Sequence, residues 1–584
     1  MRTPAVSSLA SRLRPWLVGL LLLWAVIPAV AQEGDAPNGD TSGRFFESLD
    51  VEIVNVDVWV TDRDGLPVHG LEADDFVVLR DGQPVPITNF YAVSRGRAVQ
   101  PEPTLPTIEP TPESAADEIS DLSLDAERAI DPAHRLWLIV FLDNFNLDPL
   151  DRNRVLPGVR QFLSRTLRDG DQAMLVTYDR KLEVRVPFTD DIREFDAVTE
   201  AIEEESGFVT VRKRDQADTL ERIIEAQSPG QSLSFARRYA EEQMDSVDRT
   251  AETLLRLIET LGGLEGRKAL LHVSSGIPML AGEEAFHTVA EKWGTSEAYA
   301  EIPRHDTTRR FERVTRQANA HRVTMHTLDA AGLRSMQFGQ AEYAGFVNPR
   351  IRSTLDSVVP ENLQSSLRLM ARETGGQAIL NRNDVTPALN DVASDFGSFY
   401  SLGISSTGID AGSYHALEVE LRDDCRRCSI RHREGYLSKS AATRMQETLR
   451  SVLLYTDGDN RLGVAARLGR PTPHTDDGLF VVPVDLEIPL RDLVLLPVAG
   501  GKAELRLELY VAAAGDDGAL SAVDTVPLGL RIDARHVEAA RGESFRHTHR
   551  LLLPAGRRKI GLAVFDTIGG ERAVLTRALD VGAS

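Results

Sequence analysis

The sequence has few of the groups that most often carry chemistry. It contains two cysteines among 584 residues, which is too few for a zinc site built from four thiolates. It has no His-Glu-x-x-His or Gly-x-Ser-x-Gly motif, and no phosphate-binding loop ending in Gly-Lys-Ser or Gly-Lys-Thr. We therefore expect a protein that is not an enzyme.

Basic residues are fewer than acidic ones, 66 Lys and Arg against 88 Asp and Glu, so the formal net charge is −22. Such an acidic field repels nucleic acid and anionic membrane surfaces. The partner that we expect is therefore a protein, while a cation or a neutral ligand is also compatible with this charge.

Long apolar runs are absent after the first 31 residues. That first segment combines a basic start, an apolar stretch and a small-residue site, at Arg2, Arg12, Arg14, 16–27 and 29–31. The pattern predicts a signal peptide that is cut after Ala31, and hence a secreted or periplasmic protein without stable membrane insertion. An uncleaved N-terminal anchor is the alternative.

The length suggests three or four domains, at roughly 150 residues per domain. Alternating apolar and polar residues at 51–60 and a hairpin signal at Asp81-Gly82 predict a small β-domain of sandwich type over 45–95. Residues 96–131 are rich in proline and acid, and predict a linker.

Residues 132–438 alternate strand and helix signals. The strand signals fall at 136–142, 173–178, 267–273, 322–328 and 397–404, and a clear helix falls at 246–261. This alternation predicts an α/β domain with a doubly wound, largely parallel sheet that is covered on both faces. The polar or mixed stretches 206–240 and 277–305 are predicted to be loop insertions.

Residues 440–584 return to strand signals, which predict a second β-sandwich. The strands are expected at 479–488, 503–511, 525–532 and 551–565, followed by RAVLTRALDV. The closing hairpin resembles that of an immunoglobulin-like or fibronectin-like module, which is a likeness of architecture alone.

The strand at 136–142 ends on Asp143. In open α/β sheets ligands gather beyond the carboxyl ends of the strands, so Asp143 is the first candidate functional residue. The surrounding region resembles the von Willebrand factor A-type domain, and in particular a diverged subgroup in secreted proteins of acidobacteria and similar bacteria. The matching pieces are LIVFLDNFNL (138–147), GDQAMLVTYD (170–179), GRKALLHVSSGIP (266–278), ANAHRVTMHTLDAAGL (318–333), LMARETGGQAI (369–379) and FYSLGISS (399–406).

The resemblance implies a metal-ion-dependent adhesion site in which oxygen ligands surround a divalent cation. Asp143 matches the first ligand of that site. The two hydroxyl positions are Phe145 and Leu147, which cannot coordinate a hard cation, and the later aspartate is Ser275. We therefore expect a degenerate site in which Asp143 caps the following helix or bonds loop amides.

A metal site could still be rescued by nearby oxygens. The candidate ligands are Asp143, Asn146 and Ser275, with Asn144, Asp148 and Ser274 as further donors, and the cation would be Mg²⁺ or Ca²⁺. A metal-dependent adhesion module thus remains an alternative function to a noncatalytic binding or scaffold protein that needs no metal.

Cys425 and Cys428 form a Cys-x-x-Cys pair between two strand-like flanks. In an exported protein such a pair predicts a local disulfide that clips a hairpin. Arg426 and Arg427 would favour the thiolate, so a thiol-redox protein is a further alternative.

Overall fold

The computed structural model describes residues 53–94, 97–99, 135–207, 209–334, 349–422, 428–456, 458–474 and 478–582. The expected signal peptide, its cleavage site at Ala31, Cys425 and the linker from residue 100 to 131 lie outside these ranges. Within them, no helix is both long and apolar enough to cross a membrane.

A six-stranded sheet forms the centre of the α/β domain, in the order β11–β10–β9–β6–β7–β8. The strands are β6 Leu136–Leu142, β7 Gln172–Tyr178, β8 Leu182–Thr189, β9 Arg267–Ser274, β10 Val323–Asp329 and β11 Ala378–Ile379. All neighbouring strands are parallel except β7 and β8. The largely parallel sheet and its four strands from 136 to 328 are therefore confirmed.

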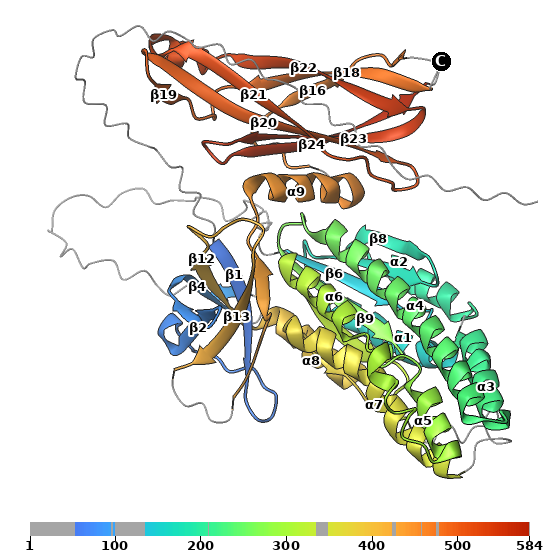
Figure 1. Ribbon diagram of the computed structural model, residues 1–584. Helices are drawn as coiled ribbons and strands as arrows, with labels where there is room; N and C mark the ends of the chain where they lie inside the picture. The colour runs from blue at the N-terminus through green and yellow to red at the C-terminus, as the bar shows by residue number, and fades with distance from the viewer. Residues whose placement is uncertain are drawn as a thin grey trace, which may run out of the picture. The chain divides into compact units, whose positions relative to one another are not determined.

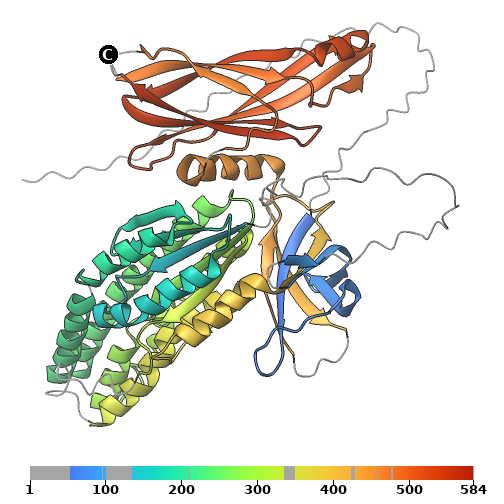
Figure 2. The same ribbon diagram turned by 180° about the vertical axis from the view of Figure 1, so that it is seen from behind.

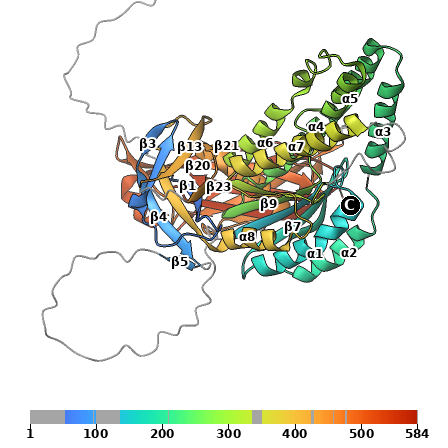
Figure 3. The ribbon, with the colours of Figure 1, turned by 90° about the horizontal axis from the view of Figure 1, so that it is seen from below.

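Helices cover both faces of this sheet (Figure 3). One face carries α1 Pro149–Thr166, α2 Ile192–Glu203 and α8 Thr386–Gly397, and the other carries α4 Pro229–Leu261, α6 Thr308–Ala320 and α7 Pro349–Glu373. Every residue of β6 is buried, and successive side chains enter opposite cores: Leu138 and Val140 enter one, Ile139 and Phe141 the other. This two-sided burial explains the uninterrupted apolar run in the sequence.

The two expected loop insertions are instead mainly helical. They contain α3 Val209–Glu225, the first turns of α4, α5 Glu283–Trp293 and a 3₁₀ turn at Ile302–His305. The prediction failed because the composition is polar, although Leu220, Ile223, Leu233 and Ala236 recur at helical spacing and enter one buried core. In Figure 1, α3 and α5 lie side by side at one end of the domain.

The N-terminal β-domain is a sandwich of two sheets, in the orders β14–β1–β12–β4–β5 and β15–β13–β2–β3. Its strands are β1 Ile53–Thr61, β2 Phe76–Arg80, β3 Gln83–Val85, β4 Ile87–Ser94, β5 Arg97–Val99, β12 Phe399–Ser405, β13 Tyr414–Leu421, β14 Ser429–His432 and β15 Gly435–Leu437, with a 3₁₀ turn at Ala73–Asp75. Side chains of both sheets share one core, as Val56 and Val78 illustrate.

Strands from two distant parts of the sequence thus build this domain. In Figures 1 and 2 the blue strands of the N-terminal segment lie among orange strands that follow α8. The expectation that residues 397–404 belong to the central sheet is therefore wrong: β12 pairs in antiparallel fashion with β1 and β4. The expected linker also begins later than residue 96, because β5 pairs with β4.

The C-terminal region contains two antiparallel sheets that face each other across one core. Its strands are β16 Ala465–Leu468, β17 Thr472–Pro473, β18 Leu479–Pro489, β19 Leu496–Val498, β20 Lys502–Gly515, β21 Asp524–Asp533, β22 Ser544–Pro554, β23 Gly556–Asp566 and β24 Arg572–Val581. Short helical turns occupy Ala534–His536 and α10 Val537–Ala540. The helix α9 Ala441–Tyr455 was not expected; its residues Met445 and Leu449 pack against the β20–β23 sheet.

Candidate functional site

The first candidate residue lies where the order of the central sheet reverses. From β6 the chain continues to β7 on one side, and it returns later to β9 on the other side. The Asp143 amide donates to the Val273 carbonyl (2.9 Å), and Ser274 pairs in register with Asp329 at the end of β10. Three polar residues from three adjacent strand ends therefore meet at a topological switch point, which is where α/β sheets bind ligands.

The carboxylate of Asp143 is fully buried and accepts three hydrogen bonds. Asn146 donates its side-chain amide (2.8 Å) and its backbone amide (3.3 Å), and the Ser274 hydroxyl donates at 3.0 Å. The His272 Nε2 atom lies 3.5 Å from the same carboxylate. Asp143 therefore holds its own loop through hydrogen bonds with Asn146 and Ser274.

Both ends of the Asn146 side-chain amide form hydrogen bonds. Its side-chain nitrogen faces Asp143, and its side-chain oxygen accepts from the guanidinium of Arg212 on α3. Arg212 also donates to the Phe145 carbonyl (3.2 Å) and to Gln243 (3.3 Å), and its guanidinium lies 5.0 Å from the Phe145 ring centre. Burial lowers the pKa of Arg212, while the negative charge of Asp143 acts in the opposite direction.

The predicted ligand Ser275 does not contact Asp143 through a hydrogen bond. Its hydroxyl is buried without a hydrogen-bond partner among the described residues, and its carbonyl accepts from Arg334. The side-chain oxygen of Asn144 is likewise buried and unpartnered within this part of the chain. The hydroxyl that reaches Asp143 is that of Ser274.

Two further residues of this loop support the fold. Phe145 packs beside Tyr178 (ring centres 5.9 Å apart), and Leu147 enters the core on the opposite face of the sheet. The cap of α1 is Asp148, which accepts a hydrogen bond from the Leu150 amide. Capping was one of the two roles that we expected for Asp143, and Asp148 has this role instead. Burial alone would raise the pKa of Asp148, but the Lys213 ammonium at 2.8 Å and the Leu150 amide lower it.

A second buried carboxylate, Asp329, was missed by the sequence analysis. Arg334 donates two hydrogen bonds to it, from Nη2 at 2.8 Å and from Nε at 3.1 Å, and Gln364 donates a third at 2.8 Å. The exposed side-chain fractions of Arg334 and Asp329 are 7% and 0%. The available signal was that Asp329 ends a predicted strand as Asp143 does.

A small cavity of about 100 Å³ lies against these groups. Its polar lining includes Asn146, Arg212, Lys213, Ser275, Glu284 and Arg334. Glu284 is buried and accepts from the Tyr239 hydroxyl and from Gln216, each at 2.7 Å. Two of the cations form ion pairs, Arg334 with Asp329 and Lys213 with Asp148. The third, Arg212, is linked to Asp143 through the side chain of Asn146.

The residues at this switch point do not suit a divalent cation. A hard cation needs several free oxygens, and only those of Ser275 and Asn144 are unpartnered among the described candidate ligands. The Asn146 oxygen is held by Arg212, and Asp143 already accepts three hydrogen bonds. The guanidinium also places a positive charge beside the same oxygens. Among the described residues no group of three or more His, Cys, Asp or Glu side chains is arranged to hold a metal.

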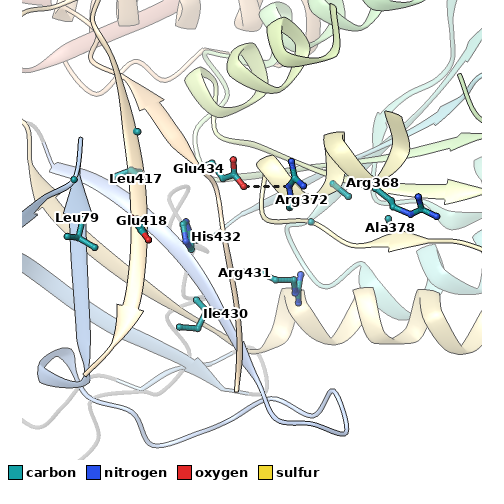
Figure 4. A pocket seen from close by; sticks show the side chains of 14 residues that line it. Leu79, Arg368, Arg372, Ala378, Leu417, Glu418, Ile430, Arg431, His432 and Glu434 are labelled. Carbon is teal, nitrogen blue, oxygen red and sulfur yellow. Dashed lines mark ion pairs between the residues drawn. The ribbon is translucent and has the colours of Figure 1, made fainter. Parts of the chain in front are cut away.

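A larger hollow of about 650 Å³ lies between α7 and strands β13 and β14 (Figure 4). Its charged side chains include Arg372 and Glu434, which are 3.8 Å apart and joined by the dashed line in the figure. Arg431 of the same hollow donates from one nitrogen, Nη2, to both oxygens of buried Asp395, at 2.9 Å each. These pairs compensate charge locally and identify no ligand.

In the part of the chain that the structure describes, the two strands around the cysteines do not pair with each other. Strands β13 and β14 flank this segment as expected, but they belong to different sheets. Cys428 packs against the core that the two sheets share, and Cys425 lies outside the described residues. The Cys425–Cys428 disulfide therefore stays a prediction.

No protein-family model matches the sequence, and no curated protein matches it. Among solved structures, the chain is similar to an aerotolerance-related membrane protein from Bacteroides fragilis, with 10% identity, coverage of 45% of this chain and 98% of the other, and a TM-score of 0.20. A von Willebrand factor type A structure from Catenulispora acidiphila has 10% identity and a TM-score of 0.20, and the match covers 77% of this chain and 66% of the other. The manganese-loaded TRAP protein of Plasmodium vivax has 10% identity and a TM-score of 0.20, and the match covers 52% of this chain and 95% of the other. TM-scores of this size assign neither fold nor function.

Proposed function

We propose that this protein is a noncatalytic binding or scaffold protein of the von Willebrand factor A-like kind, in which arginines replace the metal ion of the adhesion site. The observation that carries the proposal is the position of Asn146, which donates to Asp143 and accepts from Arg212. One side chain thereby links the carboxylate of the first ligand position to a cation from an inserted helix.

At the end of the neighbouring strand β10, an arginine likewise occupies the place of a metal ion. Asp329 is a buried carboxylate that could have completed a cation site with Asp143, but Arg334 occupies its oxygens. Arg334 also donates to the carbonyl of Ser275, which is the residue at the expected second aspartate position. Two guanidinium groups thus supply the positive charge that a divalent ion would bring, and they require no metal.

The proposed partner is a protein. The net charge of −22 opposes nucleic acid. We place the mature protein in the periplasm or outside the cell, because residues 1–31 have the pattern of a signal peptide. N-terminal sequencing of the exported protein tests this: a first residue of Gln32 is expected, and a retained Met1 contradicts it.

A thermal-shift measurement tests the absence of a metal requirement. The unmodified protein is compared in Mg²⁺, Ca²⁺, Mn²⁺ and a chelator, and we expect the same melting temperature in all four. Asp143→Asn is the test variant, and Asp190→Asn, at an exposed position, is the matched control. A cation-dependent rise in melting temperature that Asp143→Asn abolishes and Asp190→Asn retains would overturn the proposal in favour of a metal-dependent adhesion module.

Partner capture tests the binding role itself. Tagged full-length protein is incubated with cell-envelope extract, with and without chelator, and the captured proteins are compared with those bound to a heat-unfolded control. We expect specific capture that the chelator leaves unchanged. Capture that is lost with chelator supports the metal-dependent alternative, and no specific capture contradicts the binding role.

The thiol-redox alternative is tested by alkylation and mass measurement of the exported protein. With a structural disulfide, Cys425 and Cys428 are alkylated only after denaturation with reductant. Two freely alkylated thiols in the native protein would refute the disulfide, and a Cys425 thiolate that reacts near neutral pH would favour redox chemistry.

A further inference from the structure

Several positively charged side chains line a cavity away from the switch point. The cavity has a volume of about 1020 Å³ and is bordered by β1 and β4, by the ends of α4 and α6, and by residues 433–448. Among its lining residues before 449, six carry positive charge and two carry negative charge. The cations are Arg267, Lys268, Arg322, Arg433, Lys439 and Arg444, and the carboxylates are Glu265 and Glu447.

Two of these cations are buried and have only neutral partners. Lys268 is 4% exposed and donates to the Leu264 carbonyl at 2.7 Å. Arg433 is 8% exposed and donates to the carbonyls of Asn319 (3.1 Å) and Asn55 (2.8 Å). Within the described ranges neither cation has a carboxylate at ion-pair distance. A buried charge in this state is costly unless an opposite charge approaches it.

Neighbouring cations increase that cost. Burial lowers the pKa of Lys268 well below its usual value, and the charges of Arg322 and Lys439 lower it further. Burial, followed by the charge of Arg322, lowers the pKa of Arg433 to about 10. His321 is held neutral because burial lowers its pKa to about 3, so it does not add to this charge near neutral pH.

Arg322 brings a charge that is available to a ligand. Its side chain is exposed and forms no hydrogen bond or ion pair with any residue that the structure describes. Its backbone is left-handed, with φ of 58°, because the chain reverses between α6 and β10 at this point. A guanidinium can bind two oxygens of one oxyanion side by side.

We propose that this cavity binds a multivalent oxyanion, a ligand with two or more phosphate or carboxylate groups. Its volume is at the upper end of the range for small-molecule sites, and it exceeds the space that a single phosphate needs. Six cations face the two carboxylates of the lining and Asp57, which lies 3.5 Å from Arg267, so an excess of positive charge remains in a chain whose net charge is −22. A bound polyanion would neutralise Lys268 and Arg433, which the protein itself leaves without carboxylate partners.

Titration calorimetry on the full-length protein tests the proposal. The probes are inorganic triphosphate and citrate, each titrated at the same ionic strength set with sodium chloride. We expect saturable binding of at least one probe with one site per chain, and the preferred probe identifies the oxyanion as phosphate or carboxylate. The absence of saturable heat with both probes overturns the proposal.

A matched pair of variants locates the binding. Arg322→Asn removes the charge and keeps a residue type that tolerates left-handed backbone, and it should weaken binding about tenfold, as expected for one charge-assisted hydrogen bond. Arg309→Asn removes an equal charge from an exposed position on α6 outside the cavity lining, and should leave affinity unchanged. Equal effects of the two variants would contradict the cavity as the site.

A third variant should act in the opposite direction. The carboxylate of Glu447 accepts from Lys439 at 2.8 Å and competes with a bound anion for that cation. Glu447→Gln removes the competitor, and it should strengthen binding of the preferred probe several-fold. A folding defect cannot produce tighter binding, so unchanged or weaker binding in this variant argues against the proposal.

Discussion

The guanidinium of Arg334 and the carboxylate of Asp329 form a bidentate pair that is almost completely removed from solvent, with hydrogen bonds of 2.8 and 3.1 Å. Asp329 ends β10, and Arg334 follows it by five residues in the chain. The pair therefore closes the loop after β10 over the carboxyl end of the sheet, next to Asp143. Its integrity should matter more for stability than the ion pairs on the surface.

Arg334→Met should lower the free energy of unfolding by about 3–5 kcal/mol, because Asp329 would remain buried without its cation. The double variant Arg334→Met with Asp329→Asn should recover part of this loss, since it removes the uncompensated charge. Chemical denaturation monitored by circular dichroism measures both. The control Arg238→Met breaks an exposed pair with Glu242 and should cost less than about 0.5 kcal/mol. A loss in Arg334→Met as small as in the control would contradict the assignment.

The buried histidine His326 should make stability depend on pH. Burial, reinforced by the charges of Arg431 and Arg267, lowers its pKa from 6.5 to about 3 in the folded protein. The unfolded chain binds the proton below about pH 6.5 and the folded protein does not, so the free energy of unfolding falls as pH decreases between these values. The slope contributed by this residue is about 1.4 kcal/mol per pH unit.

His326→Gln isolates this contribution, because glutamine can still accept the hydrogen bond from the Gln377 amide but does not titrate. Denaturation midpoints measured from about pH 6 to about pH 4 should show a shallower decline in this variant than in the unmodified protein. His536→Gln, at an exposed site, is the control and should keep the original slope. Parallel slopes for His326→Gln and the unmodified protein would refute a neutral buried imidazole.

Gly376 allows close contact between the end of α7 and the central sheet. A Cβ atom at this position would collide with the carbonyl oxygen of Met325 in β10, which the sheet holds in place. Gly376→Ala should therefore lower the unfolding free energy by about 1–3 kcal/mol. Gly230→Ala in α4 meets no described atom within 4 Å and should stabilise by up to about 1 kcal/mol. Equal melting temperatures for the two variants would contradict this close contact.

The sheet topology also predicts where the chain can be divided. A fragment of residues 132–438 contains β12 and β13 but lacks their partners β1, β2 and β4. Limited proteolysis with mass analysis should cut this fragment rapidly within residues 399–437, whereas a fragment of residues 45–438 should be protected there. Equal protection of the two fragments would show that β12 folds without the N-terminal strands.

Local patterns in the sequence predicted where the strands lie better than which strands pair with each other. The strand at 136–142 was evident because all its residues are apolar and enter cores on both faces. The strand at 399–405 was also recognised, but its neighbours were not, because a strand's own residues do not specify which distant strand completes the ladder. Trp59 and Asp395, which are joined by a hydrogen bond of 3.0 Å, lie 336 positions apart.

At the candidate site, too, the sequence predicted local features but not long-range contacts. Asp143 was found because it ends an obvious strand, and the loss of hydroxyls at Phe145 and Leu147 was visible in the sequence. Arg212 was not found, because it lies in an inserted segment whose polar composition suggested a loop. Only the three-dimensional packing of α3 brings its guanidinium to Asn146, and no short-range motif encodes that contact.

The placement of β12 between β1 and β4 has a consequence for how the protein is made. Both N-terminal strands emerge early from the ribosome, yet the strand that hydrogen-bonds to both of them is synthesised only after the whole α/β domain. Until then their open edges are exposed to pairing with other chains, which is a known route to aggregation. Folding of the β-domain should therefore be slow and late, because its ladder closes across most of the chain.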